Sequence, residues 1–317
     1  MDHPTHRSTE NTGSIGRYGP HQRATGRLVH RADHLACLGA PASAGTAAYD
    51  APMRLIDSHC HVNAERFAGD AELVVGAARL VGVERILVPG WNVASCERAL
   101  DLVERSPWLD AAVGVHPHDA AKVDDASWGR IVRWATDPRV VAIGETGLDF
   151  DRVFSPIADQ LSNLRRNLRL AVETGKPAIL HCRSASGQRD AQDTLLEEVR
   201  AIGPTPPPVV IHSFSGPVDY GRAMLDMGAA ISFSGLVFRA GEEASGELAA
   251  LVPSDRLLVE TDSPFLAPPG APKGRNEPEY VRITAAWVAE RRGIAPDALG
   301  DALVDAYDQT FRTSHAS

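Results

Sequence analysis

The residues with the clearest chemical potential stand in the segment Asp57-Ser58-His59-Cys60-His61, which closes a short apolar run. Side chains of an extended chain alternate between two faces, so His59 and His61 point to one side and Cys60 to the other. Two imidazoles at this spacing can chelate one cation. Taken alone, the motif fits a pair of surface histidines equally well, and Cys60 is expected to serve packing only.

Further candidate ligands follow other apolar runs. Glu145 is flanked by glycines, which permit close backbone approach, and a carboxylate there could bridge two cations. Asp262 could bind a cation and accept the proton of an attacking water, with Glu260 on the same face as a partner for a ligand. Each has a plain alternative, because Glu145 also fits an acid in a turn, and His181 or His212 alone fits a buried, hydrogen-bonded histidine.

Histidines concentrate where the apolar runs end. Of the seven histidines after residue 52, the six that follow such a run are His59, His61, His116, His118, His181 and His212. In a barrel of parallel strands, the carboxyl ends of all strands open onto the face that holds the active site. We therefore predict two divalent cations, either zinc, manganese or magnesium. The predicted ligands are His59, His61 and Asp262 for one cation, His181 and His212 for the other, and Glu145 as the bridge.

The elements that position these residues are short apolar runs alternating with amphipathic stretches. The predicted strands are Leu55–Asp57, Arg85–Pro89, Ala111–Val115, Val140–Gly144, Ala178–Leu180, Val209–Ile211, Ala229–Phe233 and Leu257–Val259. Predicted helices include Ala71–Leu80, Ala94–Glu104, Ile157–Thr174 and Asp190–Ala201, with others after Asn276 and Pro296. Continuous apolar strands alternating with helices indicate a parallel sheet buried on both faces. Eight such units favour a closed (β/α)8 barrel of the TIM type over an open doubly wound sheet.

Residues 1–52 differ in composition from the rest of the chain. They are rich in small residues, histidine and arginine, and have neither apolar periodicity nor the apolar core of a signal peptide. We predict a disordered leader, or a start assigned upstream of a natural start at Met53. Residues 53–317 are then the hydrolase barrel.

The bulk properties limit the class of partner and compartment. A net charge of −9 argues against a broad basic surface that coats nucleic acid. It is compatible with a nuclease, because cations and a few arginines can supply a local positive field. No run approaches the roughly 18 apolar residues of a membrane span. The four cysteines are scattered, which favours the reducing cytoplasm.

With these residues in view, the chain resembles the TatD family of metal-dependent deoxyribonucleases in the amidohydrolase superfamily. The matching segments span Arg54–Phe311 in the family's order and are LIDSHCH, GVHPH, AIGETGLDF, ILHCRSA, VIHSFSG, ISFSG, LLVETDSPFLAP and GRNEP. The resemblance implies a TIM-type barrel, divalent metals at the six predicted ligands, and DNA as the substrate of phosphodiester hydrolysis. It also places His116 and Arg183 in the substrate region, and it implies neither a membrane nor an obligate protein partner.

Some positions depart from the family's usual residues or allow two interpretations. The departures at Thr146, Asp151, Ser184 and Ser213 touch none of the predicted ligands. Arg183 could hold an anionic substrate group or form a structural ion pair. Arg275 could clamp a phosphate, while Asn276 beside it could cap the next helix together with Glu279.

Two other functions compete with the nuclease. One is an amidohydrolase-type enzyme acting on a small amide, lactone or phosphoester. Many such relatives bridge their metals with a carbamylated lysine, whereas here Lys176 precedes its strand and Glu145 fills the bridging position. The other is a metal-binding barrel without catalysis. The intact ligand set argues against it, because an unpaired acid such as Asp262 has little reason to lie in a barrel mouth without a cation.

Overall fold

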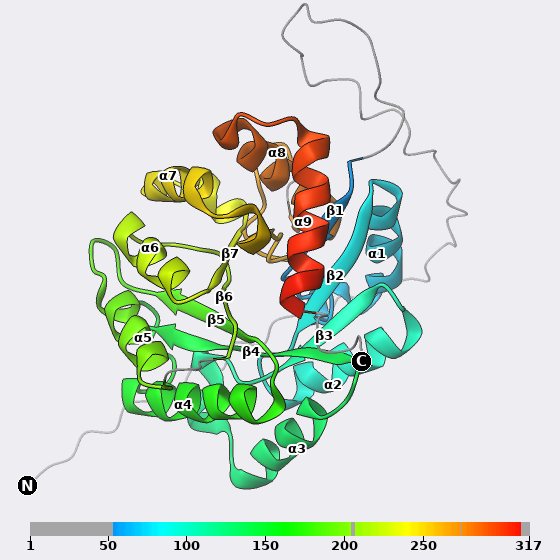
Figure 1. Ribbon diagram of the computed structural model, residues 1–317. Coiled ribbons are helices and arrows are strands. Elements are labelled where there is room, and N and C mark those ends of the chain that lie inside the picture. Colours follow the sequence, from blue (N-terminus) through cyan, green and yellow to red (C-terminus); the bar gives the residue numbers. More distant parts are fainter. Residues whose placement is uncertain (1–52, 204–206, 273, 312–317) are drawn as a thin grey trace, which may run out of the picture. The chain divides into compact units, whose positions relative to one another are not determined.

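Eight strands pair in chain order, each parallel to the next, in the residues that the computed structural model describes, 53–203, 207–272 and 274–311 (Figure 1). They are β1 Leu55–Asp57, β2 Val83–Pro89, β3 Leu109–Val113, β4 Val140–Asp149, β5 Ala178–Arg183, β6 Val209–Ile211, β7 Ala230–Phe233 and β8 Leu257–Val259. The predicted leader at residues 1–52 lies outside the described residues and stays a prediction.

The first and last strands close the barrel. Just beyond β1, Ser58 N donates to Val259 O of β8 at 3.0 Å, and Asp262 N donates to His59 O at 2.9 Å. The predicted TIM-type barrel is thereby confirmed. Every predicted ligand lies in the second half of a strand or within a few residues after one, which places it at the carboxyl-terminal mouth.

Helices alternate with the strands and surround the barrel (Figure 1). They are α1 Ala71–Leu80, α2 Val93–Arg105, α3 Asp125–Ala135, α4 Ile157–Thr174, α5 Asp190–Arg200, α6 Val218–Asp226, α7 Glu243–Leu251, α8 Val281–Arg292 and α9 Pro296–Phe311. Short 3₁₀ helices are η2 Glu65–Phe67, η3 Pro117–Lys122, η4 Gly235–Phe238, η5 Ser254–Arg256 and η6 Pro278–Tyr280. The predicted bounds of α1 and α4 are confirmed. None of the helices in this part of the chain has the length and apolar character needed to cross a membrane.

Five strands differ from their predicted bounds. β2 begins two residues earlier than predicted and β7 begins one residue later. β3 begins and ends two residues earlier than predicted, β4 continues to Asp149, and β5 continues to Arg183. The extension arises because the β4–β5 ladder runs beyond the apolar residues, pairing Gly147 with His181 and Asp149 with Arg183. Hydrophobicity marks the buried middle of these strands, whereas backbone pairing carries them into the polar mouth.

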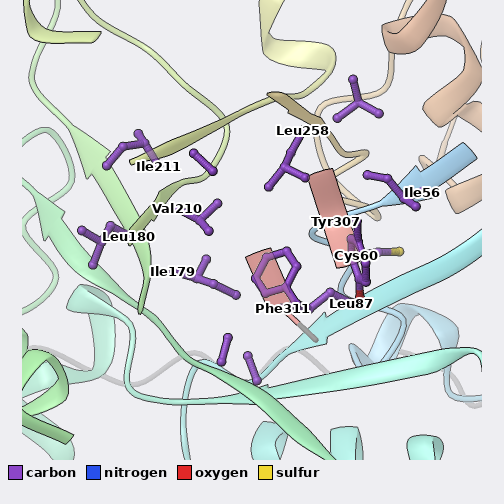
Figure 2. Packing of buried hydrophobic residues seen from close by; sticks show 14 of the residues in the cluster. Ile56, Cys60, Leu87, Ile179, Leu180, Val210, Ile211, Leu258, Tyr307 and Phe311 are labelled. Carbon is purple, nitrogen blue, oxygen red and sulfur yellow. The ribbon is translucent and has the colours of Figure 1, made fainter. Parts of the chain in front are cut away.

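The core fills the barrel and the space between strands and helices. Ile179, Val210 and Leu258 of three strands lie in the buried cluster together with Tyr307 and Phe311 of α9 (Figure 2). Tyr307 is fully buried, and its Oη donates to Asp110 Oδ2 on β3 at 2.9 Å. The last helix therefore packs into the core and satisfies a buried carboxylate there.

Glycines set the path of β4 between its neighbours. A Cβ on Gly114 of the β3 segment would lie 2.6 Å from Gly144 Cα, and one on Gly144 would lie 2.7 Å from Ile179 O. At Gly147, with φ 139°, a Cβ would overlap the carbonyl oxygen of His181. The predicted close backbone approach around Glu145 is confirmed, and only glycine permits it at these positions.

Gly147→Ala should lower the free energy of unfolding by about 3 kcal/mol or more, because the new methyl group overlaps backbone and the φ angle is unfavourable. Urea denaturation followed by circular dichroism measures the change. Gly76→Ala is the control, since nothing lies within 4 Å of a Cβ there and the site is inside α1. That change should stabilise by about 0.5–1 kcal/mol. Equal stability of the two variants would contradict the steric argument.

Candidate metal centre

The end of β1 and the end of β8 together position three predicted ligands. The Asp57 carboxylate accepts hydrogen bonds from Thr261 N at 2.9 Å and from Thr261 Oγ1 at 2.6 Å, which ties the two segments side by side. As a result, Asp262 Oδ1 lies 3.4 Å from His61 Nε2 and 4.0 Å from His59 Nε2. Asp262 has φ 52°, a left-handed conformation that non-glycine residues seldom adopt, and its presence at a ligand position is typical of a functional site.

Glu145 projects from β4 into the middle of the histidines. Its side chain is almost fully buried, and its backbone N donates to Gly90 O at 2.8 Å. Oε2 lies 3.3 Å from His59 Nε2 and 3.5 Å from His61 Nε2. Oε1 faces the other way, toward the histidines at the ends of β3, β5 and β6. One carboxylate oxygen of Glu145 thus lies beside the two histidines that follow β1.

The second oxygen of Glu145 lies close to predicted ligands from two other strands. Oε1 lies 3.3 Å from His181 Nδ1 on β5 and 3.0 Å from His212 Nε2, just after β6. His212 also stacks on His59, with ring centroids 3.9 Å apart and planes at 16°. All six predicted ligands therefore converge in one buried cluster at the barrel mouth.

Two further carboxylates orient these histidines from outside. Glu260 Oε1 is 3.0 Å from His212 Nδ1, which is the partner role that the sequence indicates for it. Asp149 Oδ2 lies 3.4 Å from His181 Nε2 and 2.7 Å from His118 Nε2. Asp149 has no assigned role in the sequence analysis, because the predicted strand ends at Gly144. With β4 running on, Glu145 and Asp149 share one face at an even spacing.

The donor set suits a divalent cation. Three groups of ligand atoms each lie within 4.8 Å of one another in the described residues, namely His59–His61–Glu145, His116–Glu145–His181 and His59–His212–Asp262. The ring nitrogens His59 Nε2 and His61 Nε2 face each other at 3.1 Å, beside the Glu145 carboxylate. Imidazole and carboxylate are ligands of zinc and manganese, and several of both are buried here close together. The residues present fit such ions.

Burial and mutual charge set the protonation of the ligands. Burial would raise the pKa of Glu145, but His116, His212 and His59 hold that pKa well below its usual range. Burial lowers the pKa of His59, and the neighbouring His212 lowers it further. Burial also disfavours the proton on His212, yet Glu145 and Glu260 raise the pKa of His212 well above its ordinary value of 6.5. The cluster without a cation therefore holds an ionised Glu145 beside a protonated His212 at neutral pH.

The two residues assigned to the substrate by resemblance lie at the rim of this cluster. His116 Nε2 is 3.3 Å from Glu145 Oε1, the same distance as His181 Nδ1, so its position fits a metal ligand as well as a substrate contact. Burial lowers the pKa of His116 to about 4, which makes it a neutral imidazole. Arg183 is about half exposed and pairs with Asp151 at 2.8 Å.

Arg275 occupies a different environment. Its Nη1 and Nη2 both donate to the Asp70 carboxylate, at 2.9 and 2.7 Å, and Nη2 also donates to Glu277 at 3.0 Å. Its guanidinium lies over the Phe67 ring at 4.4 Å. Both terminal nitrogens are engaged by carboxylates, so the expectation that Arg275 clamps a phosphate does not fit this arrangement. It fastens the loop after β8 to η2 instead.

Asn276 does not cap the following helix. Its Nδ2 donates to Thr261 O at 2.8 Å and to Phe265 O at 2.6 Å, while α8 begins at Val281 after the turn of η6. The predicted capping pattern is wrong, because the turn at Pro278 separates the asparagine from the helix. The side chain instead satisfies buried carbonyl groups in the loop that carries Asp262.

Comparison with known proteins identifies the family. The family described as "TatD related DNase" matches residues 56–312. The chain belongs to the TatD family. It is accordingly a metal-dependent hydrolase acting on ester bonds.

Individual TatD relatives cover nearly the same part of the chain. The 3′-5′ ssDNA/RNA exonuclease TatD of Erwinia billingiae is 37% identical over 253 residues, which is 78% of this chain and 94% of that protein. The uncharacterized metal-dependent hydrolase YabD of Bacillus subtilis (strain 168) is 34% identical over 259 residues, covering 81% of this chain and 99% of that one. The crystal structure of YjjV, a TatD homolog from Escherichia coli K12, has 29% identity and a TM-score of 0.75, covering 83% of this chain and all of that one, 100%.

Asp262→Asn should reduce the rate of hydrolysis by on the order of 10²-fold or more, because the amide cannot accept a proton from water. Asparagine tolerates the left-handed backbone of residue 262, so the variant should fold as the parent does. Steady-state rates and the melting temperature, measured on the same preparation, check both statements. Full activity in a folded Asp262→Asn variant would show that the proton acceptor lies elsewhere.

Cation affinity should rise with pH until the raised pKa of His212 is passed. His212 has a raised pKa and holds a proton at neutral pH without a cation, so binding must release that proton and becomes easier as pH rises through the raised pKa. His116, with a pKa near 4, is neutral throughout and should release none. Isothermal titration of Zn²⁺ or Mn²⁺ in buffers of different ionisation enthalpy counts the protons released. No proton release at pH 7 would contradict this protonation state.

Proposed function

We propose that this protein is a nuclease that hydrolyses phosphodiester bonds of DNA with two divalent cations. The observation that carries the proposal is the Glu145 carboxylate, which turns Oε2 toward His59 and His61 and Oε1 toward His181 and His212. A buried carboxylate between two sets of imidazoles has the geometry of a bridge. Two-cation sites recur in enzymes that displace an oxygen at phosphorus.

The relatives support the same substrate class. The family is described as DNase, and the Erwinia billingiae relative is named a 3′-5′ ssDNA/RNA exonuclease. Both names refer to hydrolysis of a phosphodiester within a nucleic acid strand. We infer the same chemistry for this chain because its six predicted ligands all lie inside the matched region.

The chain's own residues divide the work of hydrolysis. Divalent cations held by this cluster supply Lewis acidity, which lowers the pKa of water and offsets the charge of a phosphodiester. Burial would raise the pKa of Asp262, but hydrogen bonding and charge from His61 lower it, so its carboxylate is ionised at neutral pH. Its Oδ atoms can then accept the proton of the attacking water. Glu260 holds the His212 ring in a fixed orientation through Nδ1.

Arg183 supplies positive charge near the mouth. It ends β5 two residues after His181 and is about half exposed. Its ion pair with Asp151 is at the surface and contributes little stability, so a phosphate can compete for the guanidinium. We assign Arg183 to a phosphate that flanks the scissile bond, and His116 to the region next to Glu145.

The small-molecule amidohydrolase is the weaker alternative. A carbamylated lysine bridge is not available among the described residues, because Lys176 Nζ donates to Ala135 O at 2.6 Å and to Asp137 O at 3.0 Å, near the opposite ends of the strands. Lys122 pairs with Asp119 at 2.6 Å in η3. Glu145 occupies the bridging place instead. More distant amidohydrolase structures under 25% identity share the fold alone.

The direct test is hydrolysis of end-labelled single-stranded DNA after chelation and reconstitution with Zn²⁺, Mn²⁺ or Mg²⁺ in turn. The proposal expects release of nucleotides or short fragments with at least one of these ions and none with the chelated protein. Matched assays with RNA, a lactone and an amide run alongside. A protein that opens a lactone or amide but cleaves no nucleic acid with any ion would contradict the substrate while leaving the metal centre intact.

Arg183→Ala should weaken binding of oligonucleotides and reduce the slope of log K against log salt by about one, because one phosphate contact is lost. The metal content should not change. Arg165→Ala is the matched control, since Arg165 is an exposed arginine in an ion pair with Glu198 on the outer helices. It should leave the salt slope as in the parent. Identical salt slopes for both variants would show that Arg183 does not contact a phosphate of the substrate.

A further inference from the structure

Two exposed phenylalanines stand on opposite sides of the metal centre. Phe154 is 65% exposed on the loop after β4, and Phe265 is 53% exposed on the loop after β8. In a closed barrel of eight strands in sequential order, β4 and β8 lie across from each other. The other six phenylalanines of the chain are buried or partly buried. An isolated exposed apolar side chain needs no explanation, but this pair has a common location.

The Phe154 loop is fixed at both ends and strained in the middle. Asp149 Oδ1 accepts from Asp151 N at 3.1 Å and Arg152 N at 2.8 Å, and Ser155 Oγ donates to His118 O at 3.0 Å. Between these anchors, Val153 has φ 42°, a conformation that is unfavourable for a β-branched residue. The loop thus holds two apolar side chains in water at a cost in backbone energy, which indicates a function for them.

The Phe265 loop repeats this construction. Phe265 N donates to Asp262 O at 2.9 Å, and Phe265 O accepts from the buried Asn276 Nδ2 at 2.6 Å. The next residue, Leu266, has φ 49°, another left-handed non-glycine position. Two unrelated loops therefore each combine firm anchors, a strained residue and a phenyl ring directed to solvent.

Each ring lies beside one side of the metal centre. The Phe154 ring centroid is 4.7 Å from that of His118, whose partner Asp149 also contacts the ligand His181. The Phe265 ring is 6.1 Å from His61. Both contacts are edge-to-face, at 75° and 72°, so neither phenyl ring is stacked on the histidine beside it.

We propose that Phe154 and Phe265 are stacking platforms for unpaired nucleobases on the two sides of the scissile phosphate. This inference rests on the proposed nuclease function and names the side chains that would hold the bases of its substrate. A phosphodiester bound at Glu145 extends its sugars and bases outward to both sides, toward the two rings. Bases within a duplex are stacked on each other and cannot reach a phenyl face, whereas every unpaired base offers one. The acidic chain also gains sequence-independent affinity here without a broad basic surface.

The test compares four variants on two substrates, a single-stranded oligonucleotide and a small phosphodiester that has no base. Phe154→Leu and Phe265→Leu keep apolar bulk but remove the π face, and each should raise KM for the oligonucleotide about five-fold or more. As a result, the kcat/KM for the oligonucleotide divided by that for the small diester should fall. Phe154→Tyr and Phe265→Tyr keep the ring and should restore most of that ratio.

Trp108→Ala is the control, because Trp108 is an exposed aromatic residue that precedes β3, at the opposite end of the barrel. Its ratio should equal that of the parent. A strand with abasic sugars flanking the cleaved bond should be cleaved equally well by parent and Leu variants. If the parent cleaves the oligonucleotide and the Leu variants match it, or if Leu and Tyr variants lose activity alike, the stacking proposal is overturned and the nuclease function stands. If the parent cleaves no nucleic acid with any ion, the nuclease function itself fails.

Discussion

The structure of the barrel mouth depends on one buried carboxylate. Glu145 lies among imidazoles from the ends of four other strands, and its two oxygens face different sets of them. A buried charge is tolerated only where opposite charge surrounds it, which protons on histidine provide in the absence of cations and the cations themselves provide when bound. The ligands of β1, β5, β6 and β8 are therefore arranged around Glu145 of β4. Without its carboxylate, protonated histidines buried side by side would repel one another.

The fold and the convergence of the six predicted ligands were largely predictable from sequence, because apolar runs and the histidines that follow them both lie at strand ends. β1, β6 and β8 have their predicted bounds, and the six predicted ligands converge. Asp149 was not predicted, since hydrophobicity ends at Gly144 while backbone pairing continues. The capping role of Asn276 was predicted wrongly, because a sequence pattern cannot show which buried carbonyl groups a distant loop brings to an amide.

Constrained backbone conformations surround the candidate site at the barrel mouth. Gly147 lets β4 pack closely against the backbone of His181. Residues in the left-handed conformation, such as Asp262 and Val153, set the direction of the loops. These features cost stability locally and are tolerated because a continuous core in the barrel supports the strands beneath them. Arg275, expected at the substrate, instead fastens one of these loops, whereas Arg183 is about half exposed and pairs with Asp151.

The central claim is that Glu145 joins two cations, and the number of bound ions per chain tests it most directly. Elemental analysis of the purified protein, after reconstitution with Zn²⁺ or Mn²⁺ and removal of excess ion, should give two ions per chain. Glu145→Gln keeps the shape but loses the charge between the two sets of histidines, and it should give fewer than two. A parent chain that saturates at one ion, or a Glu145→Gln variant that still holds two, would contradict the account.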